Sequence, residues 1–246
     1  MNALILLRVS CSRRVRSRAE CGIRRREMFA DMGNFDAEWA AAPEAVRRCL
    51  ALAYEALVAG GLAVGSVLTD PTGTVRAEGR NHAYDDGPGE GPLRGTPLAH
   101  AEMNALGAAR TDWDLGALTL WSTQEPCSMC TAAAAFTGVG TVRYLAPDPW
   151  ALATGNDGSS GVAGMDRQPW LVAANVMFLL SVSAAAQRTE EPATLTRCRE
   201  LETETVGLLD ALPPGLPAVR TAEAWLEGLW HAIGDAATAR RLRLEG

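Results

Sequence analysis

Hydrophobic residues in the first half of the chain switch between helical and extended spacing. From Pro43 to Ala59 they recur at helical spacing, and two glycines end the run, which predicts a helix. Residues 63–69 and 74–78 have the composition of strands, and the turn residues Asp70-Pro71-Thr72-Gly73 separate them. This pattern predicts a hairpin that follows the helix.

The alternation continues beyond a long polar segment. Residues 83–97 contain four Gly, three Pro and three acids and predict a loop of the kind that often serves as a lid or binding segment. A helix is predicted over 98–110, a strand over 117–121, a helix from about 127 to 136 and a strand over 141–145. Strands that alternate with helices favour an α/β fold with some parallel pairing.

The composition changes after residue 147. Residues 154–164 are rich in Gly and Ser and predict a linker, and three helical stretches follow over 169–187, 192–212 and 220–243. The second and third carry apolar stripes, including Trp225 and Trp230 in the third, which indicate packing surfaces. We expect this extension to pack on the preceding domain rather than to form a dimer by itself.

One of these stretches is apolar enough to raise the question of a membrane span. The run from Pro169 to Ala186 is interrupted by Asn175, Ser181 and Ser183. It therefore predicts a buried helix of a soluble, cytoplasmic protein rather than a transmembrane segment.

Charge is distributed unevenly along the chain. The net charge is −6, and every basic residue is Arg. Residues 1–27 hold eight Arg against two Glu, a net charge of +6, whereas the rest holds 15 Arg against 27 acids, a net charge of −12. An acidic body argues against a broad nucleic-acid surface.

The Arg-rich segment, taken as residues 1–33, has several interpretations. It could be a nucleic-acid arm or an organelle transit peptide, but its short apolar run does not fit a secretory signal. We expect it to be disordered, or to be upstream DNA translated from a wrongly assigned start, with Met28 or Met32 as the initiator. The chain then divides into a domain over 34–153 and a helical extension over 154–246.

Two short motifs carry candidate chemistry. His100-Ala101-Glu102 stands at the start of one predicted helix, and Pro126-Cys127-Ser128-Met129-Cys130 stands at the start of another. One His and two Cys are a ligand set typical of catalytic zinc, which leaves a fourth position open for water. Cys127 and Cys130 are three residues apart in a first helical turn, so both sulfurs fall on one side, where the helix dipole favours thiolates.

Glu102 separates a catalytic from a structural zinc site. At a helix N-terminus that faces a metal, His100 can bind the ion while Glu102 reaches the water that the ion activates. A structural site would need a fourth protein ligand, and the remaining histidines, His82 and His231, belong to no ligand motif. The pattern therefore favours catalytic zinc, although a C-x-x-C pair alone could also be a redox pair or half of a structural site.

The order H-x-E and then P-C-x-x-C is the signature of zinc deaminases. Residues 43–146 resemble the cytidine and deoxycytidylate deaminase superfamily, in the branch that includes guanine, cytosine and tRNA adenosine deaminases. The resemblance implies a three-layer α-β-α sandwich with a mixed five-stranded sheet, Zn²⁺ on His100, Cys127 and Cys130, and Glu102 as proton shuttle. It also implies a homodimer.

The resemblance leaves the substrate open. It implies that Asn81, which follows the second strand, faces the substrate ring or sugar, whereas a turn Asn ending the hairpin is the alternative. A hydrolytic deaminase of a small nucleobase or nucleoside is the leading hypothesis. A tRNA adenosine deaminase and a non-catalytic zinc-binding scaffold are the alternatives. The long acidic segment between Asn81 and His100 and the helical extension depart from the family pattern.

Overall fold

The computed structural model describes residues 33–85, 91–148, 162–164, 168–186 and 191–246. Nearly all of the Arg-rich segment and most of the predicted linker over 154–164 lie outside these residues. The elements, in chain order, are α2 (Phe35–Ala41), α3 (Glu44–Val58), β1 (Gly65–Thr69), β2 (Val75–Arg80), α4 (Ala101–Gly107), a 3-10 helix η1 (Leu115–Ala117), β3 (Thr119–Gln124), α5 (Ser128–Thr137), β4 (Thr141–Ala146), β5 (Val162–Gly164), α7 (Gln168–Ala185), α8 (Ala193–Leu201), α9 (Thr203–Asp210) and α10 (Ala222–Glu245).

The strands form one mixed sheet in the order β2-β1-β3-β4-β5. β1 is antiparallel to β2 and to β3, while β3, β4 and β5 run parallel. The expected hairpin of β1 and β2 is confirmed, and Gly73 in its turn has a φ of 87°, a value that favours glycine. The α/β class and the mixed pairing predicted from the sequence are therefore confirmed.

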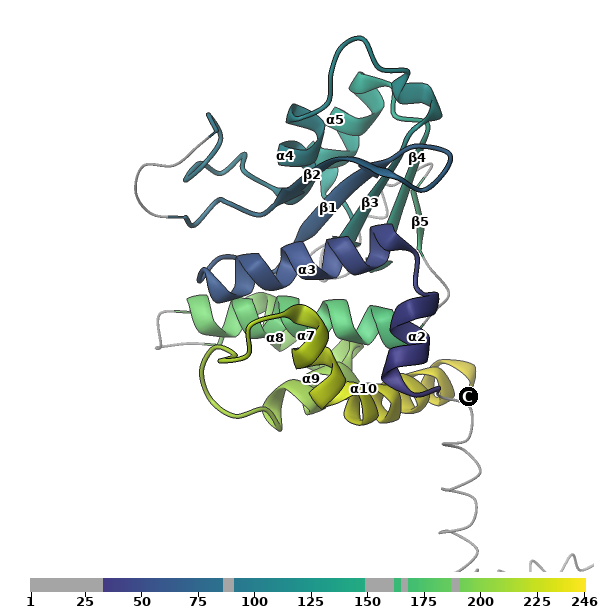
Figure 1. The fold of residues 1–246 in the computed structure, drawn as a ribbon. Coiled ribbons are helices and arrows are strands. Elements are labelled where there is room, and N and C mark those ends of the chain that lie inside the picture. Colours follow the sequence, from purple (N-terminus) through teal and green to yellow (C-terminus); the bar gives the residue numbers. More distant parts are fainter. Residues whose placement is uncertain (1–32, 86–90, 149–161, 165–167, 187–190) are drawn as a thin grey trace, which may run out of the picture. The chain divides into compact units, whose positions relative to one another are not determined.

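Helices cover both faces of this sheet, as Figure 1 shows. Successive strand residues point to opposite faces, so Leu68 packs with α4 and α5 while its neighbour Val67 packs with α3. α7 contacts β3 and β4 and lies beside α3. The face under α4 and α5 is the one that carries the candidate site.

Two glycines allow helices to lie unusually close to strands. A Cβ on Gly65 of β1 would lie 2.2 Å from the Cys49 carbonyl oxygen of α3. A Cβ on Gly79 of β2 would lie 2.5 Å from the Ala101 carbonyl oxygen and 2.5 Å from the Ala105 nitrogen of α4. The absence of a side chain at Gly79 therefore sets the position of α4 against the sheet.

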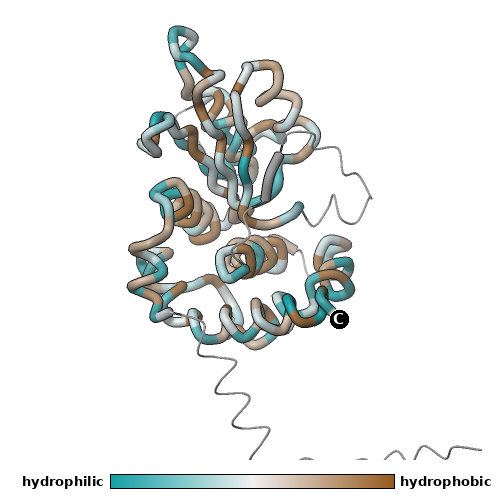
Figure 2. The backbone as a smooth tube through the Cα atoms, turned by 90° about the vertical axis from the view of Figure 1, so that its right-hand side faces the viewer, coloured by the Kyte–Doolittle hydropathy of each residue, from teal (hydrophilic) through white to brown (hydrophobic). Residues whose placement is uncertain are grey.

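The helical extension packs on the domain, as expected. Helix α7 is buried along most of its length, and the Ala63 N–H donates to the Ser181 Oγ at 2.9 Å. The rings of Trp170 and Trp230 lie 4.8 Å apart, which joins α7 to α10. Figure 2 shows that the helices next to the sheet are predominantly hydrophobic. Although both follow residue 153, β5 is an edge strand of the sheet and α7 packs against β3 and β4.

Among the described residues, α7 is the one helix long and apolar enough, by length and composition alone, to cross a membrane. However, 61% of this segment is buried inside the protein. That burial agrees with the predicted core helix.

The predicted helix over 192–212 is wrong in one respect, because it is two helices that break at Glu202. This residue has φ −124° and ψ 46°, outside the helical region. Its buried carboxylate accepts two hydrogen bonds from the Arg240 guanidinium of α10, both at 2.6 Å. The chain thus leaves the helical path where this carboxylate meets α10, and spacing alone did not show that partner.

The close approach at Gly79 yields a testable consequence. Gly79→Ala is expected to lower the free energy of unfolding by about 1–3 kcal/mol, because the added methyl group collides with the backbone of α4. Gly107→Ala, in α4 itself, has nothing within 4 Å of the added methyl group and is the matched control. It should be neutral or stabilising by up to about 1 kcal/mol in the same urea titration. Equal effects of the two changes would contradict this account.

The extension provides a second prediction. A chain that ends at Leu145 is expected to aggregate or to remain unfolded, because it loses α7, which covers α3 and part of one sheet face. A chain that lacks only the exposed residues 244–246 is the control. Light scattering and circular dichroism distinguish the two. A soluble, dimeric and fully active product ending at Leu145 would show that the extension does not complete the core.

Candidate active site

The site forms where several strands end. Because β1 is antiparallel to both β2 and β3, the carboxyl ends of β2 and β3 lie at the same edge of the sheet. α5 follows β3 almost directly, and α4 follows the loop after β2. Both helices therefore present their N-termini at one edge, with His100 on one and the two cysteines on the other.

His100 lies just outside its helix. Helix α4 begins at Ala101, and His100 is its N-cap with φ −68° and ψ 155°. The predicted start at residue 98 is wrong because the Ala99 carbonyl accepts from the His82 N–H at 2.9 Å, which ties this segment to the chain after β2. With His100 extended and Glu102 in the first helical turn, two residues at i, i+2 reach the same site.

Cys127 occupies the equivalent place on α5. It is the N-cap, with φ −62° and ψ 170°, and Cys130 lies in the first turn. Cys127 is half-buried and Cys130 fully buried. The predicted shared side of the two sulfurs is observed, since their Sγ atoms are 3.7 Å apart.

The three candidate donor atoms fit a tetrahedral zinc ion. The His100 Nδ1 lies 3.6 Å from the Sγ of Cys127 and 3.6 Å from that of Cys130. Ideal tetrahedral geometry, with zinc bonded to sulfur at about 2.3 Å and to nitrogen at about 2.0–2.1 Å, places the sulfurs about 3.8 Å apart and the nitrogen about 3.6 Å from each. His100, Cys127 and Cys130 thus form a candidate zinc site, and the distances between their donor atoms match that geometry.

Glu102 lies against this triangle and is almost completely buried. One carboxylate oxygen, Oε1, accepts a 2.6 Å hydrogen bond from the Ser122 hydroxyl of β3. The other, Oε2, is 3.5 Å from the Cys130 Sγ. The structure therefore brings together all four residues that the two motifs singled out.

The electrostatics of the donor atoms support metal binding. Hydrogen bonds from Cys130 and then His100 lower the pKa of Cys127 to about 4, so this group is a thiolate. The pKa of Cys130 is raised by its hydrogen bond with Cys127 and by burial. The Cys127 thiolate raises the pKa of His100. Without an ion, the three groups share protons that a cation would displace.

The protonation of Glu102 depends on two opposing effects. Burial raises the pKa of this carboxyl group, and the hydrogen bond from Ser122 opposes the rise. A carboxyl group whose pKa lies above its usual range is suited to taking up and returning a proton.

Asn81 lies at the same edge, one residue after β2. It is buried, and its Oδ1 accepts from the Ala83 N–H at 3.0 Å. This contact is the turn role that the sequence left as an alternative. Asn81 remains a candidate for substrate binding because of its place beside the segment that leads to His100.

A buried carboxylate shapes the loop after Asn81. Asp85 accepts from the Arg80 guanidinium at 2.7 Å, from the His82 Nδ1 at 2.8 Å and from the Arg94 guanidinium at 2.7 Å. Although burial opposes it, the hydrogen bonds from Arg80 and His82 lower the pKa of Asp85. Two arginines and one histidine thus hold the described parts of the loop near the site.

Sequence reasoning missed three features of this region. Ser122 and Gln124 lie on β3 two residues apart, so they share the face of Leu120, which packs with α4 and α5. Alternation along the strand could have placed them there. The Gln124 amide is buried with no hydrogen-bond partner among the described residues. The convergence of three side chains on Asp85 had no signal in the sequence, because two arginines and a histidine at irregular spacing do not identify a shared carboxylate.

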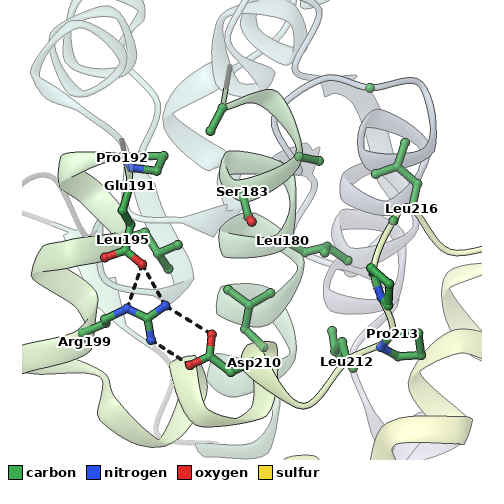
Figure 3. Close-up of a pocket in the computed structure, with 16 residues that line it drawn as sticks. Leu180, Ser183, Glu191, Pro192, Leu195, Arg199, Asp210, Leu212, Pro213 and Leu216 are labelled. Atoms are coloured by element: carbon green, nitrogen blue, oxygen red, sulfur yellow. Dashed lines mark hydrogen bonds and ion pairs between the residues drawn. The ribbon is translucent and has the colours of Figure 1, made fainter. Parts of the chain in front are cut away.

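A separate pocket of about 840 Å³ lies among α7, α8 and α9, and none of the motif residues lines it (Figure 3). Its walls are mainly apolar, and its one arginine, Arg199, pairs with Glu191 and Asp210, each at 2.7 Å. The pocket therefore offers no reactive group comparable to Glu102.

Comparison with known proteins connects the site to a family. The tRNA(Ile)-lysidine synthase of Deinococcus deserti is 36% identical over 114 residues, which cover 45% of this chain and 20% of that protein. The counterpart from Deinococcus radiodurans is 34% identical, with 18% of its length covered. The chain thus spans about a fifth of the length of the curated relatives that it matches.

Solved structures of deaminases are also similar to this chain. Guanine deaminase from Bacillus subtilis is 30% identical, with 46% of this chain and 69% of that chain covered and a TM-score of 0.37. A structure from a study of A-to-I editing by tRNA:A34 deaminases is 25% identical, with 47% and 94% covered and a TM-score of 0.37.

The family comparison covers both motifs. Residues 41–146 match the cytidine and deoxycytidylate deaminase zinc-binding region, which includes His100, Glu102, Cys127 and Cys130. The distances among the three donor atoms fit a zinc-binding family. Through residues 41–146, the chain therefore belongs to the cytidine and deoxycytidylate deaminase family.

Proposed function

We propose that the protein is a zinc-dependent hydrolytic deaminase that converts an amino-substituted nucleobase or nucleoside to the oxo form and releases ammonia. The observation that carries this proposal is the position of Glu102, a buried carboxylate 3.5 Å from a donor atom of the zinc triangle. A structural zinc site has no use for such a group. A hydrolytic site needs it to move protons.

Each residue of the site has a role in this proposal. His100, Cys127 and Cys130 hold the zinc ion, and their three positions leave a fourth for water. The ion, when bound, makes that water nucleophilic at neutral pH. Glu102 takes the proton of the water as it attacks the carbon that bears the amino group. It delivers that proton to the ring nitrogen. It then takes the proton of the hydroxyl group now on the carbon and passes it to the amino group, which leaves as ammonia while the carbon becomes a carbonyl.

Asn81 is proposed to bind the substrate ring or sugar. Support comes from its place at the carboxyl end of β2, the edge where α4 and α5 also begin. The Asn81 Oδ1 already accepts a hydrogen bond within the turn. The contact with the substrate is therefore assigned to the NH₂ group of the side chain, Nδ2.

A tRNA adenosine deaminase is the second candidate. Its tRNA substrate is favoured by the match to proteins named tRNA(Ile)-lysidine synthases, and the net charge of −12 beyond residue 27 counts against it. A gel shift with tRNA, run with and without residues 1–31, distinguishes the candidates. A non-catalytic zinc scaffold, the third, would bind zinc and release no ammonia.

The proposal extends to organisation and assembly. We propose a deaminase domain over 34–153, built as a three-layer α-β-α sandwich, and a helical extension over 154–246 whose β5 supplies the fifth strand of the sheet. The protein is proposed to be cytoplasmic and to form a homodimer through the deaminase domain. The 92% exposure of Phe136, near the C-terminal end of α5, supports an apolar contact on this domain.

The metal content tests the ligands. The purified protein is expected to contain about one zinc per chain, and His100→Ala or Cys127→Ala should lose it, because only two ligands then remain. Cys198→Ala, which removes a buried free cysteine of α8, is the control and should keep its zinc. Inductively coupled plasma mass spectrometry measures the content. Full occupancy in His100→Ala or Cys127→Ala would mean that other residues bind the ion.

Ammonia release tests the chemistry. We expect one or more of guanine, cytosine, adenine, their nucleosides and dCMP to be deaminated. Glu102→Gln should retain zinc while its turnover falls by about 10²–10⁴, because an amide cannot carry the proton. The amide keeps the size of the side chain, so the loss isolates proton transfer from packing. Near-normal turnover by this variant would contradict the assigned role.

A further inference from the structure

The two oxygens of the Glu102 carboxylate have different neighbours. Oε1 is held by the Ser122 hydroxyl at 2.6 Å, whereas Oε2 is 3.5 Å from the Cys130 Sγ. We propose that Ser122 is a positioning residue, whose hydroxyl holds Oε1 so that Oε2 faces the metal ligands and the reacting water. This inference rests on the proposed deaminase function and assigns to β3 a part in that site.

Ser122 is a rigid support for this hydrogen bond. It lies on β3 between two paired strands, opposite Ser66 of β1 and Tyr144 of β4. Its side chain is fully buried, so no solvent competes for the hydroxyl. A Glu side chain has three rotatable bonds, and a fixed donor on one oxygen removes most of that freedom.

The hydroxyl takes part in no bond making or breaking. The O–H bond of Ser122 stays intact, and the hydroxyl remains the hydrogen-bond donor to Oε1 throughout the reaction. Oε2 receives the proton of the water and passes it to the substrate, so the balance of protons is that of the proposed deamination. Loss of the hydroxyl leaves the proton shuttle in place but lets the carboxylate rotate away from its productive orientation.

Ser66 is a matched control for this role. It is also fully buried, and its hydroxyl also donates at 2.6 Å, but the acceptor is the backbone carbonyl of Trp121. It faces the same side of the sheet as Ser122, because directly opposed residues of paired strands point the same way. A purely structural effect of losing a buried hydroxyl should therefore be similar at Ser66 and Ser122.

Steady-state kinetics test the proposal on whichever compound of the panel the unaltered protein deaminates. Ser122→Ala should lower kcat by about 10- to 100-fold, the value of one hydrogen bond to a charged group, with KM within about twofold. Ser122→Thr, which restores the hydroxyl, should recover most of kcat. Ser66→Ala should leave kcat within about twofold, and all three variants should retain one zinc per chain.

A double-mutant comparison shows whether Ser122 acts through Glu102. In a Glu102→Gln background, Ser122→Ala should leave the residual rate unchanged, because no proton shuttle remains to be positioned. Urea unfolding adds a readout without turnover: Ser122→Ala should lower the midpoint less when Glu102 is already Ala.

The outcomes separate this inference from the proposed function. Additive losses of rate, or a kcat loss in Ser66→Ala equal to that in Ser122→Ala, would overturn the positioning role and leave the deaminase intact. An unaltered, zinc-loaded protein that deaminates no compound of the panel and no tRNA would overturn the function, and the inference with it.

Discussion

The donor atoms of His100, Cys127 and Cys130 can meet only because two helices begin at the same edge of one sheet. Antiparallel pairing of β1 with both of its neighbours brings the carboxyl ends of β2 and β3 to that edge. The N-cap positions of α4 and α5 then carry His100 and Cys127. Strand direction thus determines that the N-termini of these two helices meet at one edge.

The distance between α4 and the sheet is the second condition for this arrangement. Gly79 of β2 admits the backbone of α4 at van der Waals contact, and the Asn104 amide of α4 donates to the Arg80 carbonyl at 2.9 Å. Helix α4 therefore lies close to β2 because Gly79 has no side chain, and the hydrogen bond from Asn104 to Arg80 holds it there. Glu102, two residues before Asn104 in α4, reaches β3 as a result.

Much of the site could be predicted because its chemistry lies in short contiguous motifs. The hairpin turn and the two ligand motifs depend on neighbours within four residues, which a sequence displays directly. The break at Glu202, the start of α4 after His100 and the hydrogen bond of Ser122 depend on partners 17 to 38 residues apart along the chain. Periodicity carries no information on such partners, so these features are visible only in the folded structure.

The structure of the helical extension could likewise be predicted only in part. Its apolar stripes predicted burial, and Trp225, Trp230 and Ile233 are indeed buried. What the stripes could not show is that α7 covers the sheet while α10 packs outside it against α7 and α9. A largely apolar helix such as α7 has no continuous polar face, so its neighbours must enclose it on several sides.

The carboxylate of Asp85 also determines how the site responds to salt. Its side chain is 2% exposed and is paired with Arg80, His82 and Arg94, so mobile ions screen these contacts weakly. Pairs at the surface, such as Arg199 with Asp210, are screened much more. The described part of the chain around Asp85 should therefore keep its shape as ionic strength rises. A salt-dependent reaction rate would then report the charge of the molecule that arrives at the site, and not a loosening of the site itself.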